Sequence, residues 1–314
     1  MGSRHISVLF GGKSLERDIS VRTGHRVIRA LTARGYTVTL IDVDANLVRR
    51  LDELKPEGAF VAMHGKGGED GTVQELLEIL GIPYTGSGVL ASIIAMDKVL
   101  TKYILAAKGI PTPAFHAFND AAFRELGAKD SLEIIAGQLG LPLIVKPAAQ
   151  GSALGVFLAR QVSELPNAMV SALSFDRKVL LERYIHGREL AVSVLGTDAP
   201  RILPIVEAIP TIGHVFYDFD SRYTAGQTDF VAPAELEPRI AAEVERLALE
   251  TYRALGCRGF GRVDLMLDDT GQPWVLELNT IPGLTDTSTM HIAAQAAGMS
   301  FEDLVVEVME SAFA

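Results

Sequence analysis

Four polar side chains, set two apart in two short apolar segments, form the pattern in this chain with the clearest chemistry. Arg262 and Asp264 alternate with apolar residues in the first segment, and Glu277 and Asn279 do so in the second. This period predicts two strands, each with one buried face. Residues 268–273 between them (DDTGQP) have the composition of a turn. If the strands fold back symmetrically, Asp264 lies opposite Glu277 and Arg262 opposite Asn279.

A hairpin of this register gathers two carboxylates, an amide and a guanidinium on one face. Carboxylate and amide oxygens are ligands for a hard cation such as Mg²⁺, which usually also holds substrate phosphates. Arg262 beside that cation suggests stabilisation of negative charge that develops during a reaction. The alternative is a salt bridge with a satisfied asparagine on a solvated sheet face, and a one-residue slip in register would separate the four groups. Asn279 leads directly into a Pro-Gly loop, where a substrate could approach.

Three other loops of small residues are candidates for phosphate binding, and only the one after Lys146 fits that role. Residues 12–14 (GKS) resemble the end of a Walker phosphate loop, but Ser7 stands where that motif requires glycine. Residues 86–91 (GSGVLA) fit a dinucleotide pattern without a good preceding strand, which favours a tight strand-to-helix turn. Lys146 ends an apolar strand before a loop of small residues, an arrangement that would set an ammonium and backbone N–H groups around phosphates. A flexible hairpin loop with an exposed lysine is the alternative there.

Ionisable residues also follow other expected strands. Glu16 comes after the first strand and His64 after the third, so two adjacent strand ends would bring them toward one crevice, where Glu16 could hold a substrate ammonium. A solvated loop acid is the alternative. The loop 210–232, which carries Arg222 and Tyr223, has the length of a lid, or else it is a surface excursion with a packed tyrosine.

Length and composition limit the class of protein. With 314 residues, 48% of them hydrophobic and 22% charged, the chain has an ordinary soluble balance and room for two or three lobes. A net charge of −10 argues against a general nucleic-acid binder. The single cysteine, Cys257, excludes an internal disulfide framework and fits a reducing compartment. Because no apolar run has the length of a membrane span or a signal-peptide core, we expect a cytoplasmic enzyme.

The expected secondary structure begins with alternating strands and helices. We expect strands at 6–10, 36–43 and 59–63 and helices at 20–34 and 72–80, which predicts a parallel sheet with ligand-facing loops after the strands. A helix at 97–108 precedes a boundary at 111–113 (PTP). The second region holds strands at 143–147, 156–159 and 179–182, a helix at 164–173 and an expected hinge at 184–187. The last region holds mixed strands, the loop 210–232, a helix at 238–255, the hairpin and a terminal helix.

Taken together, these motifs resemble the D-alanine–D-alanine ligase family of the ATP-grasp superfamily over essentially the whole chain. The matching segments, in order, are 11–20 (GGKSLERDIS), 64–71 (HGKGGEDG), 84–88 (YTGSG), 96–98 (MDK), 145–147 (VKP), 261–264 (GRVD) and 277–283 (ELNTIPG). The resemblance implies an α/β protein with the ATP-grasp fold in three lobes. These are an N-terminal parallel-sheet domain at 1–95, a central lobe at 96–185 and a C-terminal lobe at 186–314.

The resemblance also implies a role for individual residues. ATP would be clasped between the central and C-terminal lobes by Lys98, Lys146, Gly151, Ser152, Glu182, Ile185, Glu189, Met266 and Leu276. Two Mg²⁺ ions, with Mn²⁺ as an alternative, would be held by Asp264, Glu277 and Asn279. Glu16 would anchor the first substrate's ammonium, supported by Ser152, Tyr223 and His64. Arg262 and the Gly283 N–H would stabilise a tetrahedral intermediate, and Ser288 and Arg222 would receive the second substrate's carboxylate.

The implied activity is ATP-dependent ligation of two D-alanines through an acyl phosphate, for peptidoglycan precursors, by a homodimer. Some residues depart from the family's pattern. Residues 150–153 read QGSA where the family usually has EGSS, Arg222 stands where it usually has lysine, and Thr289 where it usually has leucine. Because these changes cluster near the phosphate loop and the second-substrate pocket, the alternative is a ligase for another second amino acid, such as D-serine or a specialised-metabolism substrate. A non-catalytic nucleotide-binding relative is disfavoured by the retained lysines and metal ligands.

Overall fold

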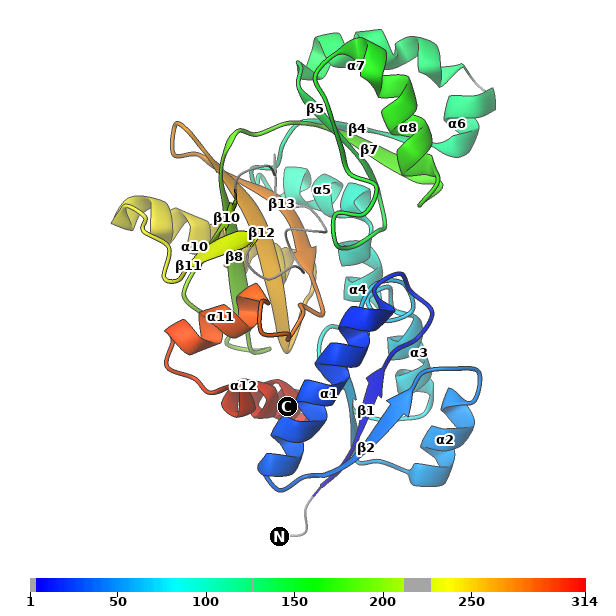
Figure 1. Cartoon of the computed structure of the whole chain (residues 1–314), viewed down its shortest axis with the longest axis vertical. Coiled ribbons are helices and arrows are strands. Elements are labelled where there is room, and N and C mark those ends of the chain that lie inside the picture. The colour runs from blue at the N-terminus through cyan, green and yellow to red at the C-terminus, as the bar shows by residue number, and fades with distance from the viewer. Residues whose placement is uncertain (1–3, 126, 212–226) are drawn as a thin grey trace.

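Three sheets, each with its own helices, are arranged along the long axis of the molecule (Figure 1). The computed structural model describes residues 4–125, 127–211 and 227–314. Arg222 and Tyr223 therefore lie outside the described residues.

The N-terminal sheet is parallel, as the strand–helix alternation predicts. Its strands run in the order β2 (Thr37–Asp42), β1 (His5–Phe10), β3 (Gly58–Val61). The helices of this part are α1 (Arg17–Ala33), α2 (Leu47–Leu54) and α3 (Thr72–Ile79). All four residues of β3 are buried, as expected for a parallel strand covered on both faces. The loops after β1 and β3 carry Glu16 and His64 and lie at the same edge of the sheet.

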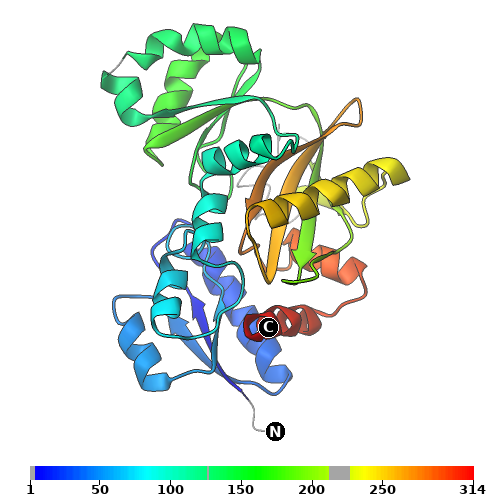
Figure 2. The ribbon, with the colours of Figure 1, turned by 180° about the vertical axis from the view of Figure 1, so that it is seen from behind.

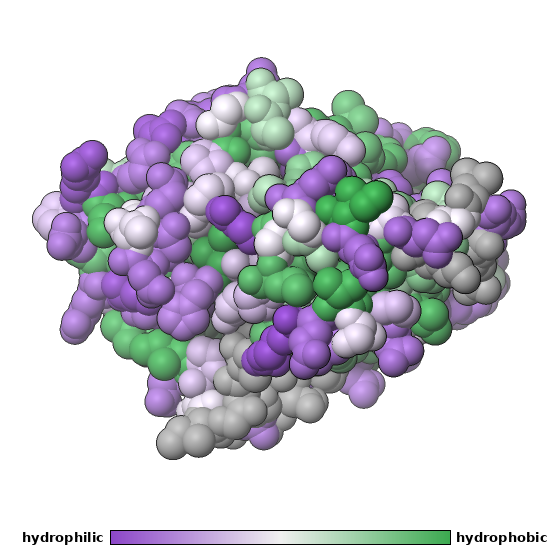
Figure 3. All heavy atoms as spheres, turned by 90° about the horizontal axis from the view of Figure 1, so that it is seen from above, coloured by the Kyte–Doolittle hydropathy of each residue, from purple (hydrophilic) through white to green (hydrophobic). Residues whose placement is uncertain are grey.

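The central sheet is antiparallel, in the order β4 (Phe115–Asn119), β7 (Lys178–Arg183), β5 (Leu143–Pro147), β6 (Phe157–Ala159). Its helical segments are α6 (Asp120–Glu125), η1 (Ala128–Ser131), α7 (Leu132–Leu139), η2 (Val162–Glu164) and α8 (Leu165–Leu173). Apolar residues of α7 and α8 form one core with alternate residues of β5 and β7. The helices therefore cover one face of the sheet, and Lys146 and Glu182 are placed on the other. Seen from above, this end of the molecule carries mostly hydrophilic side chains with smaller hydrophobic areas between them (Figure 3).

The C-terminal sheet has the order β11 (Thr228–Val231), β10 (Val206–Pro210), β8 (Gly187–Leu195), β12 (Phe260–Asp268), β13 (Pro273–Asn279), with β9 (Arg201–Ile202) paired to β8. Helix α10 (Pro238–Ala254) lies across the back of this sheet (Figure 2). The chain ends in α11 (Thr289–Ala296), α12 (Phe301–Glu310) and η3 (Ser311–Phe313). Helix α12 packs against α1, which ties the C-terminus to the N-terminal sheet.

Two consecutive helices, α4 (Val89–Met96) and α5 (Lys98–Ala107), join the N-terminal sheet to the rest of the molecule. Buried Ala91 and Leu105 pack into the core under the C-terminal sheet. Asp97, between the helices, caps α5 by accepting hydrogen bonds from the backbone N–H groups of Val99 and Leu100, at 3.0 and 3.2 Å. The cap fixes the first turn of α5 and with it Lys98.

Differences from the expected elements have identifiable causes. The loop expected at 210–232 is wrong at its end, since 228–231 form the edge strand β11. The single terminal helix is wrong too, because Gly298 takes a left-handed φ of 75° and separates α11 from α12. The expected hinge at 184–187 is the connection between β7 and β8, which belong to different sheets. At its end, a Cβ on Gly187 would stand 2.0 Å from the carbonyl oxygen of Leu267, so only glycine fits.

Within the described residues, no helix combines the length and the apolar character needed to cross a membrane.

Removing the helix cap at Asp97 tests how α5 is held. We expect Asp97→Ala to lower the free energy of unfolding by about 1 kcal/mol or more, because the cap and the ion pair with Lys178 at 2.5 Å are both lost. Asp97→Asn is the matched control, since asparagine also caps helices but carries no charge. Urea denaturation measures both variants. Equal destabilisation by the two would assign the effect to the ion pair and not to the cap.

Candidate active site

Two adjoining pockets contain every predicted site residue that the structure describes. The first is lined by residues predicted to act on the substrates, namely Glu16, His64, Ser152, Arg262, Gly283 and Ser288, and also by Gly151, predicted to bind the nucleotide, and Asn279, predicted to bind metal. The second is lined by residues predicted to bind a nucleotide or metal, namely Lys146, Glu182, Ile185, Glu189, Asp264, Met266 and Leu276. Lys98 and Glu277 line both. A group shared between the pockets would therefore meet Lys98 and Glu277.

The hairpin has the predicted register at its functional end. In β12 and β13, Arg262 pairs with Asn279 and Asp264 with Glu277. A β-bulge then shifts the pairing by one residue, so that Leu265 pairs with Val275. Bulges re-aim side chains next to many active sites. Here the bulge allows Asp264 and Met266 of one strand and Leu276 of the other to line the same pocket.

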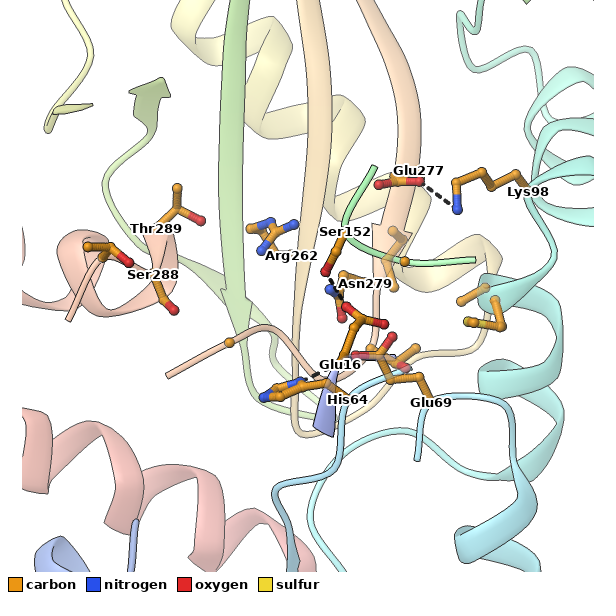
Figure 4. A pocket seen from close by; sticks show the side chains of 17 residues that line it. Glu16, His64, Glu69, Lys98, Ser152, Arg262, Glu277, Asn279, Ser288 and Thr289 are labelled. Carbon is orange, nitrogen blue, oxygen red and sulfur yellow. Dashed lines mark hydrogen bonds and ion pairs between the residues drawn. The ribbon is translucent and has the colours of Figure 1, made fainter. Parts of the chain in front are cut away.

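Arg262 and Asp264 form a bidentate ion pair along β12. The Nε and Nη2 groups of Arg262 donate to the two carboxylate oxygens of Asp264 at 2.6 and 2.7 Å. Asp264 is only 4% exposed, so this pairing offsets the cost of burying its charge. Arg262 itself lines the first pocket (Figure 4).

Lys98 bridges the central loop and the hairpin. Its ammonium lies 3.0 Å from the Glu277 carboxylate and donates to the Gln150 backbone oxygen at 2.8 Å. Figure 4 shows this ion pair on the side of the pocket opposite Ser288. The helix cap at Asp97 holds Lys98 in this position from one side.

Asp264, Glu277 and Asn279 have the chemistry to hold a hard divalent cation. In the described part of the chain, no three His, Cys, Asp or Glu side chains are grouped as a metal site. The three side chains offer oxygen ligands from two carboxylates and one amide. Both carboxylates are already paired with cationic side chains, Asp264 with Arg262 and Glu277 with Lys98. Such a set suits Mg²⁺ or Mn²⁺ bound together with phosphate oxygens, because Mg²⁺ rarely relies on protein ligands alone.

Lys146, at the end of β5, is buried and paired. The alternative of a flexible loop would require an exposed lysine there. Lys146 is 7% exposed and donates to Glu182 on the neighbouring strand β7 at 2.5 Å. A second lysine, Lys102, pairs with the same carboxylate at 2.9 Å. Lys102 was not identified from the sequence, although its position four residues after Lys98 places both on one face of the expected helix.

Glu16 is a buried carboxylate at the N-terminus of α1. It is 4% exposed, and Ser152 donates a short hydrogen bond to its Oε1 atom. Oε2 has no hydrogen-bond partner among the described residues. A Cβ on Gly65 or Gly151 would lie 2.4 or 2.7 Å from that oxygen, so both glycines are needed to enclose it. Burial, reinforced by the charge of Glu69, raises the pKa of the Glu16 carboxyl above its ordinary value.

His64 lies beneath Glu16, and both of its ring nitrogens have partners (Figure 4). Its Nδ1 lies 3.1 Å from the Ile281 carbonyl oxygen, which can only accept, so Nδ1 carries the proton. Nε2 lies 3.0 Å from the Thr23 hydroxyl. The ring thus ties the first sheet to the loop after β13, and Glu69, buried beside it, lines the same pocket.

The loop 150–155 reaches over both pockets in a strained conformation. Ser152 and Ala153 have φ values of 55° and 56°, in the left-handed region that non-glycine residues seldom adopt. Each costs about 1–2 kcal/mol. The strain coincides with the hydrogen bond from Ser152 to Glu16, so the loop is held across the lobes by the site itself.

The N-terminus of α11 forms the far wall of the first pocket. Ser288 is the N-cap residue, and its hydroxyl accepts from the Thr285 backbone N–H at 3.0 Å. A Cβ on Gly283 would stand 2.8 Å from that hydroxyl, which explains the glycine. Thr289, the next residue, is 3% exposed, and its hydroxyl has no partner among the described residues. The N-terminus of a helix favours a carboxylate.

Comparison with known proteins identifies relatives along the whole chain. Family models described as D-ala D-ala ligase N-terminus and C-terminus match residues 49–87 and 104–310. The chain is 47% identical to D-alanine–D-alanine ligase of Desulforudis audaxviator, with 98% of both chains covered. It is 44% identical to that of Moorella thermoacetica over 98% of both. It also resembles the crystal structure of D-alanine–D-alanine ligase from Bacillus anthracis complexed with ATP, with a TM-score of 0.83, 33% identity and coverage of 99% and 98%.

The buried carboxyl of Glu16 should make the fold less stable as pH rises. Its pKa is raised on folding, so the folded chain keeps the proton that the unfolded chain loses, and stability falls once pH exceeds the unfolded pKa of about 4.3. We expect Glu16→Gln to be more stable than wild type at pH 7 by about 1–3 kcal/mol, with the difference shrinking toward pH 4.

Urea denaturation from pH 4 to 8 measures this difference, with Glu245→Gln, an exposed carboxyl on α10, as the control. A Glu16→Gln protein that is no more stable at pH 7, or whose advantage does not change with pH, contradicts the assignment.

Proposed function

The chain belongs to the D-alanine–D-alanine ligase family, and from this premise we propose that it joins two D-alanines into D-alanyl-D-alanine for peptidoglycan precursors. As a member of this family it is an ATP-dependent ligase with the ATP-grasp fold. The observation that carries the proposal is the pair of adjoining pockets that share Lys98 and Glu277. One pocket suits a nucleotide and the other a zwitterion, so phosphoryl transfer would occur where they meet.

We assign ATP to the second pocket. Lys98 and Lys146 would contact its phosphates, with the N–H groups of the loop at Gly151 and Ser152. Glu182 and Ile185 would lie at the adenine edge, and Glu189 would bind the ribose. Apolar Met266 and Leu276 from the two strands of the hairpin offer a surface for the base.

Mg²⁺, with Mn²⁺ as an alternative, is the metal that the hairpin oxygens favour. Asp264, Glu277 and Asn279 would hold two ions, whose charge would offset that of the phosphates during transfer.

The first D-alanine is proposed to bind beside Glu16. The buried Oε2 oxygen of Glu16, enclosed by two glycines and without a partner, has the chemistry to accept a hydrogen bond from a substrate ammonium. Binding an ammonium there would compensate the charge that burial disfavours. Ser152 and His64 support this position from two sides, and Tyr223 completes the proposed network.

The reaction would then proceed in two steps. The carboxylate of the first D-alanine attacks the γ-phosphorus and ADP leaves, which forms an acyl phosphate. The amine of the second D-alanine attacks the acyl carbon, loses a proton, and inorganic phosphate leaves. Arg262 and the Gly283 N–H would stabilise the tetrahedral oxyanion. Ser288 and Arg222 would hold the second carboxylate near the α11 N-terminus.

A different second amino acid is the alternative that a specific observation favours. Thr289 lines the first pocket and places a buried hydroxyl there without a partner among the described residues. A side-chain hydroxyl on the second substrate, as in D-serine, could satisfy it, because an unpaired buried polar group is costly.

We propose that the protein acts as a homodimer in the cytoplasm, with small-molecule substrates and without nucleic-acid or membrane partners. We propose lobes at 1–95, 96–185 and 186–314. Helix α5 falls in the central lobe of this division, although it packs against β13 of the C-terminal sheet.

Phosphate release measured across pairs of D-amino acids tests the proposed reaction. We expect the highest kcat/KM with two D-alanines. Release should require both an amino acid and Mg²⁺, and Glu277→Gln should lower kcat by about 100-fold or more, because Glu277 lies where both pockets meet.

The same assay separates the rivals. Higher kcat/KM for D-alanine with D-serine supports the alternative second substrate and defeats the claim for two D-alanines. ATP binding without amino-acid-dependent phosphate release would show a nucleotide-binding protein and not a ligase.

A further inference from the structure

Lys102 is a fully buried lysine that none of the roles proposed above uses. It lies on α5, one helical turn after Lys98, and has no exposed surface. Lys98 and Lys102 therefore project from the same face of the helix toward the nucleotide pocket. A lysine buried to this extent requires compensation for the lost hydration of its charge.

Three oxygen atoms surround the Lys102 ammonium. Its Nζ lies 2.6 Å from the Thr112 hydroxyl, 3.1 Å from the Pro113 carbonyl oxygen and 2.9 Å from the Glu182 carboxylate. Because a lysine ammonium has three N–H donors, these partners match its bonding capacity. The ring of Phe115 lies 5.2 Å away and closes the remaining side. Burial lowers the pKa of Lys102, while Glu182 opposes that shift.

Glu182 is consequently shared by two cations. Lys146 approaches Oε1 at 2.5 Å and Lys102 approaches Oε2 at 2.9 Å. Burial alone would raise the pKa of Glu182, but the two ammonium groups outweigh it and hold the pKa below its ordinary value. The cluster of two lysines and one carboxylate carries one excess positive charge. Lys146 and Glu182 line the pocket, while Lys102 lies behind them.

The two lysines differ in their freedom to leave Glu182. Lys146 is at the pocket wall, 7% exposed, whereas Lys102 is enclosed and held by two further oxygens. If Lys146 were the sole partner of Glu182, turning toward a phosphate would strand a buried carboxylate, which is strongly unfavourable. With Lys102 in place, Glu182 keeps a counter-charge whichever way Lys146 points.

We propose that Lys102 is a positioning residue for the nucleotide phosphates. It neutralises Glu182 from behind and so releases the Lys146 ammonium to bind the phosphate chain of ATP. The excess positive charge of the cluster is then available to an anionic ligand before that ligand arrives. This inference rests on the assignment of ATP to the second pocket.

The test compares ligands with and without phosphates. Titration calorimetry of the full chain measures the affinity for ATP, with Mg²⁺ present, and for adenosine. We expect Lys102→Met to lower the ratio of ATP to adenosine affinity by about tenfold, the value of one charge-assisted hydrogen bond, because Lys146 stays with Glu182. Lys108→Met, an exposed lysine at the end of the same helix, is the matched control and should leave the ratio unchanged.

A second variant separates positioning from a merely structural role. In Lys102→Met combined with Glu182→Gln, no buried carboxylate retains Lys146, so the ratio should return to within about threefold of wild type. Rescue supports the proposal even if Lys102→Met alone fails to fold. An unchanged ratio in Lys102→Met, or a reduced ratio in the double variant, overturns it. Wild-type protein that binds no ATP would instead refute the proposed function.

Discussion

The antiparallel pairing of β12 with β13 determines where the charges of the site can be. Arg262 opposite Asn279 and Asp264 opposite Glu277 put two carboxylates, an amide and a guanidinium on one face. Side chains alternate along a strand, so a shift of one residue would turn half of them into the core beneath. The bulge after Asp264 occurs beyond these pairs and keeps Met266 and Leu276 on the nucleotide side. Everything proposed about metal and phosphate depends on this register.

Charge balance then explains why so many ionisable groups can be buried together. Asp264 is paired with Arg262, Glu277 with Lys98, and Glu182 with both Lys146 and Lys102. Each of these three carboxylates has a cationic partner before any ligand binds. The cluster of Lys102, Lys146 and Glu182 carries one excess positive charge. Glu16 is different, since its Oε2 oxygen is buried without a partner. The second pocket, lined by Lys146, can therefore accept an anion, and the first pocket can accept a cation beside Glu16.

Sequence patterns predicted the elements whose periodicity is strong and missed features that depend on tertiary contacts. The parallel N-terminal sheet, α10 and the pairing of Asp264 with Glu277 follow from local alternation and turn composition. Lys102 was missed because its burial depends on how the chain folds back after α5 to bring Thr112 and Pro113 to its ammonium, and on Glu182 of β7, which is distant in the sequence. The strained φ of Ser152 likewise coincides with a tertiary contact that composition does not specify, whereas the helix break occurs at a glycine, Gly298, which is a signal of a helix end in the sequence itself. The edge strand β11 was not predicted, because it lies within the long segment that was expected to be a loop. It forms by pairing with β10.

We propose that the face of the hairpin formed by β12 and β13 holds divalent metal together with nucleotide. Anomalous X-ray scattering from crystals grown with ADP and Mn²⁺ tests it most directly, because manganese is located independently of the protein's phases. We expect a manganese peak at about 2.1 Å from oxygens of Asp264, Glu277 or Asn279, with the ADP phosphates on its other side. The hairpin would not be the metal site if nucleotide bound in the cleft with manganese absent from these three side chains, or if manganese bound only elsewhere.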